Sequence, residues 1–72
     1  MSQLTPIQEG LLYGLKQFNM PTKDAAVITA YLEEEMEQVE MMYYLATHKE
    51  ATHQEIMNKF GDILEQRENQ AN

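Results

Sequence analysis

The sequence predicts an all-α protein, a compact orthogonal bundle of four helices in a single domain spanning residues 1–72. Three observations support this fold class. Apolar residues recur at helical spacing along the chain. The pattern of a threonine followed three residues later by glutamine or glutamate, typical of helix starts, precedes two of the apolar stripes. The chain has no cysteine, and 72 residues are near the lower size limit for a stable single core.

The first helix is expected over residues 5–19. Thr5, Pro6 and Gln8 form its start, because Pro6 suits the first helical position and Gln8 completes a capping box with Thr5. An apolar stripe then follows the helix and consists of Ile7, Leu11, Leu15 and Phe18.

Two glycines, Gly10 and Gly14, lie beside this stripe. Each costs ~1 kcal/mol relative to alanine in a helix interior. A functional reason for both is a close approach to another helix, either inside the fold or across a dimer. The alternative is that a marginal helix tolerates them.

Pro21 is expected to end the first helix, and Thr22 to cap a second helix over residues 22–32, with Asp24 in its first turn. The third helix is expected over residues 34–47. Apolar residues keep one helical phase across both segments, through Ala25, Ile28, Leu32, Met36, Val39, Tyr43 and Ala46.

Continuity of this phase leaves an alternative, in which residues 23–47 form one long helix in an extended dimer. Such a helix would be ~37 Å long. A compact domain of this size has a diameter of roughly 29 Å. The mismatch favours a break near Leu32–Glu34, so that Glu33, Glu34 and Glu35 form the acidic first turn of the third helix.

The last helix is expected over residues 52–66. Thr52 and Glu55 match a capping box. The apolar stripe behind them consists of Ile56, Phe60, Ile63 and Leu64. Residues 1–4 and 67–72 are expected to be frayed.

Composition argues against an enzyme. The sequence has no cysteine nucleophile, no glycine-rich phosphate loop and no serine or threonine in a recognisable nucleophile setting. His48 and His53 flank a turn with Glu50 and Glu55 nearby, but this spacing is not a recognised metal-ligand pattern. We therefore expect no catalytic residue, no cofactor and no metal site.

The start of the sequence has no signal-peptide pattern, and no stretch is long and apolar enough to cross a bilayer. A cytoplasmic protein without a membrane partner is expected. The net charge of −7 argues against direct nucleic-acid binding. A nucleic-acid-linked regulator is the alternative function. It would be either a helix-turn-helix-like protein or an acidic helical mimic of DNA.

The first three predicted helices contain three stretches, Leu15–Met20, Asp24–Ile28 and Glu37–Leu45, that together resemble a ubiquitin-associated-type module. Leu15–Met20 resembles the end of that family's first helix and the loop after it, Asp24–Ile28 its second helix, and Glu37–Leu45 its third. The sequence departs from the family at the loop, where Asn19 or Pro21 replaces the usual glycine. The resemblance implies only a small three-helix binding scaffold.

Protein interaction is the function that the sequence favours. Met36, Val39, Tyr43 and Ala46 cover one face of the third helix, whereas Met41, Tyr44 and Leu45 lie on another. If the last helix does not cover this second face, another molecule must. We therefore predict a non-enzymatic, self-associating interaction module, a homodimer or a complex with another protein. The predicted contact residues are Met41, Tyr44, Leu45, Gly10 and Gly14.

Overall fold

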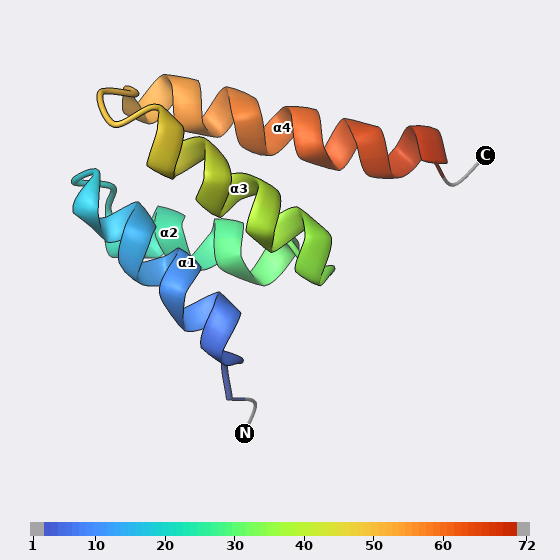
Figure 1. The fold of residues 1–72 in the computed structure, drawn as a ribbon, viewed down its shortest axis with the longest axis horizontal. Helices are drawn as coiled ribbons and strands as arrows, with labels where there is room; N and C mark the ends of the chain where they lie inside the picture. The colour runs from blue at the N-terminus through green and yellow to red at the C-terminus, as the bar shows by residue number, and fades with distance from the viewer. Residues whose placement is uncertain (1–2, 71–72) are drawn as a thin grey trace.

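The computed structural model describes residues 3–70, and within them the chain forms four helices and no strand (Figure 1). The helices are α1 (Pro6–Gln17), α2 (Thr22–Tyr31), α3 (Glu35–Thr47) and α4 (His53–Gln70). The predicted fold class is therefore confirmed. The alternative of one helix over residues 23–47 is wrong.

Helix α3 lies in the middle of the bundle, with α4 on one side and α1 on the other, and α2 lies behind them in Figure 1. Both α1 and α4 pack directly on α3, and α2 packs on α1. The core contains buried residues from all four helices and from the loops after α1 and α2: Leu11, Leu15, Met20, Ala25, Ile28, Leu32, Met41, Leu45, Ile56, Phe60 and Ile63. The stripes predicted for the first and last helices supply five of these residues.

The start of α1 is the predicted capping box. The Gln8 amide donates to the Thr5 hydroxyl at 3.1 Å, and the Thr5 amide donates to the Gln8 side chain at 2.8 Å. The helix ends at Gln17, before the predicted position 19. Asn19 has a φ of 61°, in the left-handed region that asparagine tolerates better than most residues, so the chain leaves the helix there.

Helix α2 begins at Thr22, the first residue of the predicted range, and ends at Tyr31, but the cap is not the one predicted. Thr22 is its first helical residue, and Pro21 occupies the N-cap position without a side-chain cap. The Pro21 carbonyl accepts from the Ala25 amide at 3.0 Å, so the helical hydrogen bonding starts at the proline. Asp24 lies in the first turn, as predicted.

The break between α2 and α3 falls where it was expected, and two side-chain hydrogen bonds accompany it. Glu34 caps α3, and its backbone amide donates to the Glu37 carboxylate at 3.3 Å. The buried side-chain amide of Gln38 donates to the Leu32 carbonyl at 2.6 Å. This bond satisfies the carbonyl at the end of α2, so the helix can stop inside the protein.

Helix α4 starts with the predicted capping box, in which the Thr52 and Glu55 side chains each accept from the other residue's amide. Its predicted end was residue 66, but the helix continues to Gln70. Arg67, expected in a frayed tail, donates to the Glu37 carboxylate and to the Tyr31 carbonyl, the latter at 2.7 Å. These contacts hold the additional turn. The other expected frayed residues include 1, 2, 71 and 72, which lie outside the described part of the chain.

Candidate interaction surface

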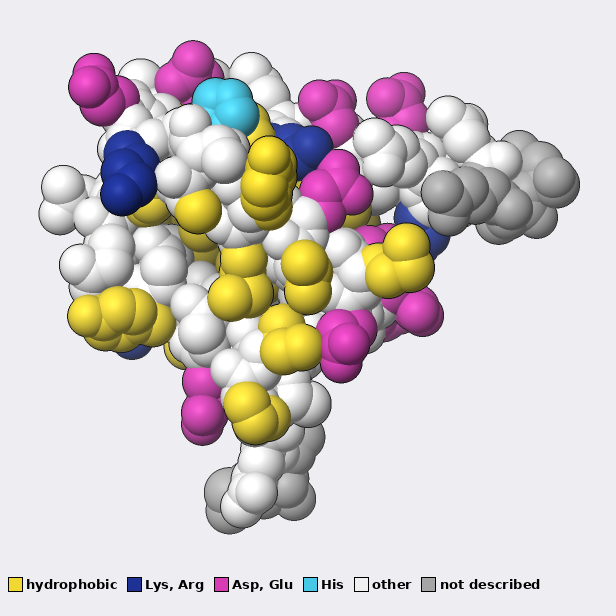
Figure 2. Space-filling model, viewed as in Figure 1, with side chains coloured by type: hydrophobic (Ala, Val, Ile, Leu, Met, Phe, Trp, Pro, Cys, Tyr) yellow, Lys and Arg dark blue, Asp and Glu magenta, His cyan; other side chains and the backbone are white. Residues whose placement is uncertain are grey.

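Three large apolar side chains lie in a row on the solvent side of α3. They are Met36, Val39 and Tyr43, with exposed fractions of 84%, 49% and 69%. We call these three residues the outward row. Figure 2 shows hydrophobic side chains gathered on this side of the molecule, over α3 and the adjoining part of α1. Acidic side chains lie around the edge of this apolar area.

The outward row reverses the prediction made for the faces of α3. Met36, Val39 and Tyr43 share a helical phase with Ile28 and Leu32, and were therefore expected to face the core. The phase does not continue, because the non-helical residues between α2 and α3 rotate the second helix relative to the first. After that turn, the residues that face inward are Gln38, Met41 and Leu45.

Met41 and Leu45 are therefore core residues and not contact residues. Met41 is fully buried and Leu45 is 6% exposed. Tyr44 is half-buried, and its ring stacks on His48 with centroids 4.1 Å apart. The Lys59 ammonium lies 5.7 Å from the centre of the same ring. The chain itself thus covers most of the face that was expected to meet a partner.

Gly10 and Gly14 lie where α1 approaches α3. A methyl group on Gly10 would lie 3.3 Å from the terminal carbon of Met42, and one on Gly14 would lie 3.5 Å from a methyl carbon of Leu45. The predicted close approach therefore occurs inside the fold. Of the two glycines, Gly10 is the one where an added methyl group would crowd its neighbour.

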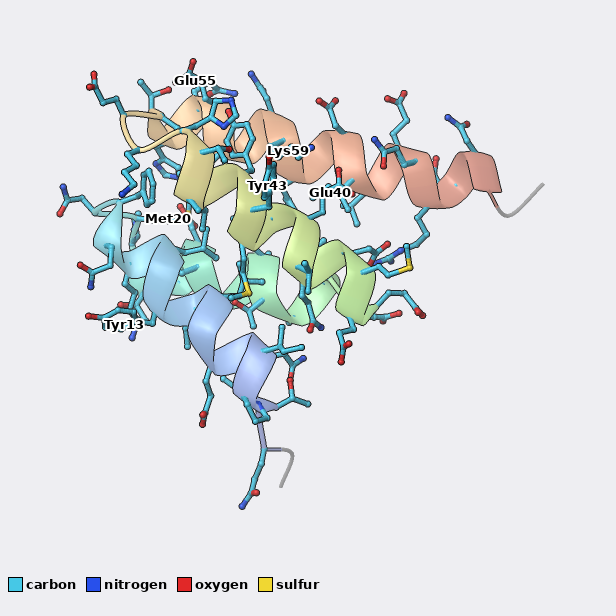
Figure 3. All side chains as sticks on the ribbon, in the orientation of Figure 1. Tyr13, Met20, Glu40, Tyr43, Glu55 and Lys59 are labelled. Carbon is cyan, nitrogen blue, oxygen red and sulfur yellow. The ribbon has the colours of Figure 1, made fainter. Side chains whose placement is uncertain are left out.

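Charged groups flank the outward row on both sides. On the side of α4, Glu40 accepts from the Lys59 ammonium at 2.8 Å. Figure 3 shows Glu40 and Tyr43 projecting from α3, with Lys59 reaching Glu40 from α4. On the other side Glu35 is exposed, and it lines a shallow hollow together with the outward row and Glu40.

An ion pair between Arg67 of α4 and Glu37 of α3 lies at the start of α3, beside this surface. Arg67 donates two hydrogen bonds to the Glu37 carboxylate, one of them from Nε to Oε2 at 2.7 Å. This bonding, with a contribution from the Glu34 backbone, lowers the pKa of Glu37 from its ordinary value of 4.5. The pair joins α4 to α3 and stabilises the fold, and the guanidinium makes a third bond to the end of α2.

The two histidines have separate partners. His53 Nε2 lies 3.3 Å from an Asp24 carboxylate oxygen, and His48 lies beside the Thr47 hydroxyl and the Tyr44 carbonyl. Across residues 3–70, no three histidine, aspartate or glutamate side chains are grouped so that they could hold a metal ion.

The described helices include none that combines the length and the apolar character required to cross a membrane. Comparisons of the chain with known protein families, with curated proteins and with solved structures found no match to any of them.

Proposed function

We propose that this chain is a non-enzymatic protein-interaction module that associates with a second copy of itself through the outward row of α3. The observation that carries the proposal is the exposure of Met36, Val39 and Tyr43 in one row. Single exposed apolar residues are common on protein surfaces, but a contiguous apolar patch is typical of an interaction site.

The chemistry of the row suits a helical partner. The spacings of three and four residues between its members are those of a helix seam that packs against another helix. Methionine adapts its shape to irregular neighbours, and tyrosine combines a large apolar area with a polar tip. A second helix laid along α3 would cover all three side chains at once.

A second copy is the occupant that we propose for this surface. A two-fold dimer uses the same patch on both subunits, so the row would cover and be covered by its own equivalent. The small size of the chain also supports association, because a domain of 72 residues gains stability by covering further apolar surface. A nucleic-acid-linked role stays a prediction from the sequence alone.

The test is the molar mass of the full chain in solution. In light scattering, the molar mass of wild type should rise with protein concentration, from that of the monomer toward twice that value. The double variant Val39→Glu, Tyr43→Glu should remain a monomer with unchanged helical circular dichroism, because the two carboxylates would be buried in the dimer without partners.

The chain provides a matched control for this variant. Val27 on α2 and Tyr13 on α1 are also exposed, by 43% and 67%, and neither belongs to the outward row. The variant Val27→Glu, Tyr13→Glu carries the same chemical changes and should associate as wild type does. A wild-type chain that stays monomeric at millimolar concentration, or a control that dissociates equally, would overturn the proposal.

A further inference from the structure

We infer that the two copies dock with their α3 helices antiparallel, so that Glu35 of each copy faces Lys49 of the other. The inference rests on the proposed function, and it adds the orientation of the partner and the charges that select it. Its basis is the unequal distribution of charge along one edge of the outward row.

The edge in question is the flank of α3 that adjoins α1. Met42 defines it, because its terminal carbon packs against Gly10 of α1. Glu35 is seven residues before Met42, which places it on the same side of the helix at the other end. Lys49 follows the end of α3, where it lines a hollow together with Gln17 and Phe18 at the end of α1. An acid and a base thus lie at opposite ends of one flank.

Orientation decides which of these charges meet. In a parallel pair of α3 helices, two-fold symmetry brings the flank with Glu35 against the opposite flank of the second copy, so Glu35 would lie near Glu40 and far from Lys49. In an antiparallel pair, the same flank of both helices comes together with the helix directions reversed. The start of one α3 then lies beside the end of the other, so Glu35 meets Lys49. Two-fold symmetry then forms the ion pair twice. A register that places Val39 of one copy against Tyr43 of the other sets Glu35 opposite residue 47, two residues and about 3 Å from Lys49, a distance that the long lysine side chain can span.

The charges on the other flank of α3, which faces α4, do not disfavour the antiparallel dimer. Antiparallel packing brings the two copies of Glu40 toward each other, but each Glu40 is already paired with Lys59 of its own chain at 2.8 Å. Glu50 follows Lys49 and offsets part of its charge. The flank with Glu35 and Lys49 is consequently the one where charge distinguishes the antiparallel from the parallel dimer.

Charge reversal tests the pairing. Glu35→Lys should weaken the dimer about three- to tenfold, because it places two like charges together at two symmetric positions. The same variant reduces the net negative charge of each chain from −7 to −5, since one acid becomes one base. Without the proposed pairing, the smaller negative charge would strengthen the dimer, because the two chains would repel each other less. The direction of the change therefore decides the question.

A double variant that exchanges the two charges completes the test. Lys49→Glu alone should weaken the dimer by a similar factor, and the double variant Glu35→Lys, Lys49→Glu should return to within about twofold of wild type. Glu65→Lys is the matched control, because it makes the same change of net charge on the exposed side of α4. It should not weaken association. Dissociation constants from sedimentation or light scattering provide the comparison.

Cysteine pairing gives an independent reading of orientation, since the chain has no cysteine of its own. Glu35→Cys and Lys49→Cys chains, one of them labelled with nitrogen-15, are mixed and oxidised. The antiparallel dimer should yield mainly the mixed disulfide, measured by mass spectrometry. A parallel dimer holds positions 35 and 49 of the two copies at opposite ends of the helix pair, so it would yield no mixed disulfide.

The outcomes separate the two claims. A wild-type monomer overturns both the proposed function and the orientation. A wild-type dimer that Val39→Glu, Tyr43→Glu dissociates, but that Glu35→Lys leaves unchanged or strengthens, supports the outward row as the interface and overturns the antiparallel pairing. A dimer that yields no mixed disulfide between the Glu35→Cys and Lys49→Cys chains overturns the pairing in the same way.

Discussion

The two faces of α3 carry similar side chains and have opposite environments. Met41 on the inward face is fully buried, whereas Met36 on the outward face is 84% exposed. Tyr44 packs beside His48 and Lys59, whereas Tyr43, its neighbour in sequence, is 69% exposed. Residue type alone therefore does not separate core from surface in this helix. The rotation of the helix about its own axis does.

The largest expected difference between the faces is in the free energy of unfolding. Met41→Ala should cost about 2–5 kcal/mol, because it leaves a cavity in the core. Met36→Ala should change the free energy of unfolding by less than about 0.5 kcal/mol, as exposed substitutions do. Urea denaturation at low protein concentration measures both without a contribution from association. Equal losses for the two variants would contradict the assignment of the faces.

The next largest difference in the free energy of unfolding is expected between a buried polar side chain of α3, Gln38, and an exposed one, Thr47. Gln38→Leu should cost about 1–3 kcal/mol, because the buried Leu32 carbonyl loses its side-chain donor. Thr47 also donates to a backbone carbonyl, that of Tyr43 at 2.9 Å, but it is exposed. Thr47→Val should therefore cost less than about 0.5 kcal/mol. The same urea experiment compares them, and a Gln38→Leu variant as stable as wild type would show that the bond from Gln38 to Leu32 does not stabilise the helix break.

The smallest expected effect is one of pH and concerns Glu37, where α3 joins α4. The folded state lowers the pKa of this carboxyl below 4.5, chiefly through its hydrogen bonds with Arg67. The pair therefore contributes stability above pH 4.5, and the contribution is lost as the pH falls through the lowered value. The free energy of unfolding should decrease less steeply below pH 4.5 in Glu37→Gln than in wild type.

A second variant checks the cause of this effect. Arg67→Met removes the other member of the pair, so it should give the same shallower acid dependence. The double variant should be no shallower than either single variant. Thermal unfolding at several values of pH provides the measurement. An acid dependence as steep as that of wild type in both single variants would show that the pair does not set this part of the curve.

Local features of the fold could be predicted from the sequence. The capping boxes of Thr5 with Gln8 and of Thr52 with Glu55 depend on residues three positions apart, and both form as expected. The break near Leu32–Glu34 followed from the length that one helix would reach in a small domain. Each of these inferences uses only neighbouring residues or overall size.

The exposed surface could not be predicted in the same way. Apolar spacing indicates that residues such as Met36 and Val39 share a phase with Leu32, but this relation holds only while the helix continues. The non-helical residues between α2 and α3 change the phase by an angle that apolar spacing does not encode, and the break includes the bond from Gln38 to the Leu32 carbonyl. The outward row was consequently mistaken for core, and Met41 and Leu45 for contact residues.

The bond between Gln38 and Leu32 thus has a consequence beyond the stability of one turn. A helix turns by about 100° with each residue, so the residue at which α3 begins selects the side chains that it displays. Neither Gln38 nor Leu32 belongs to the outward row, and both are buried. A change at either position could alter what the protein presents to its surroundings while every residue of that display stays the same.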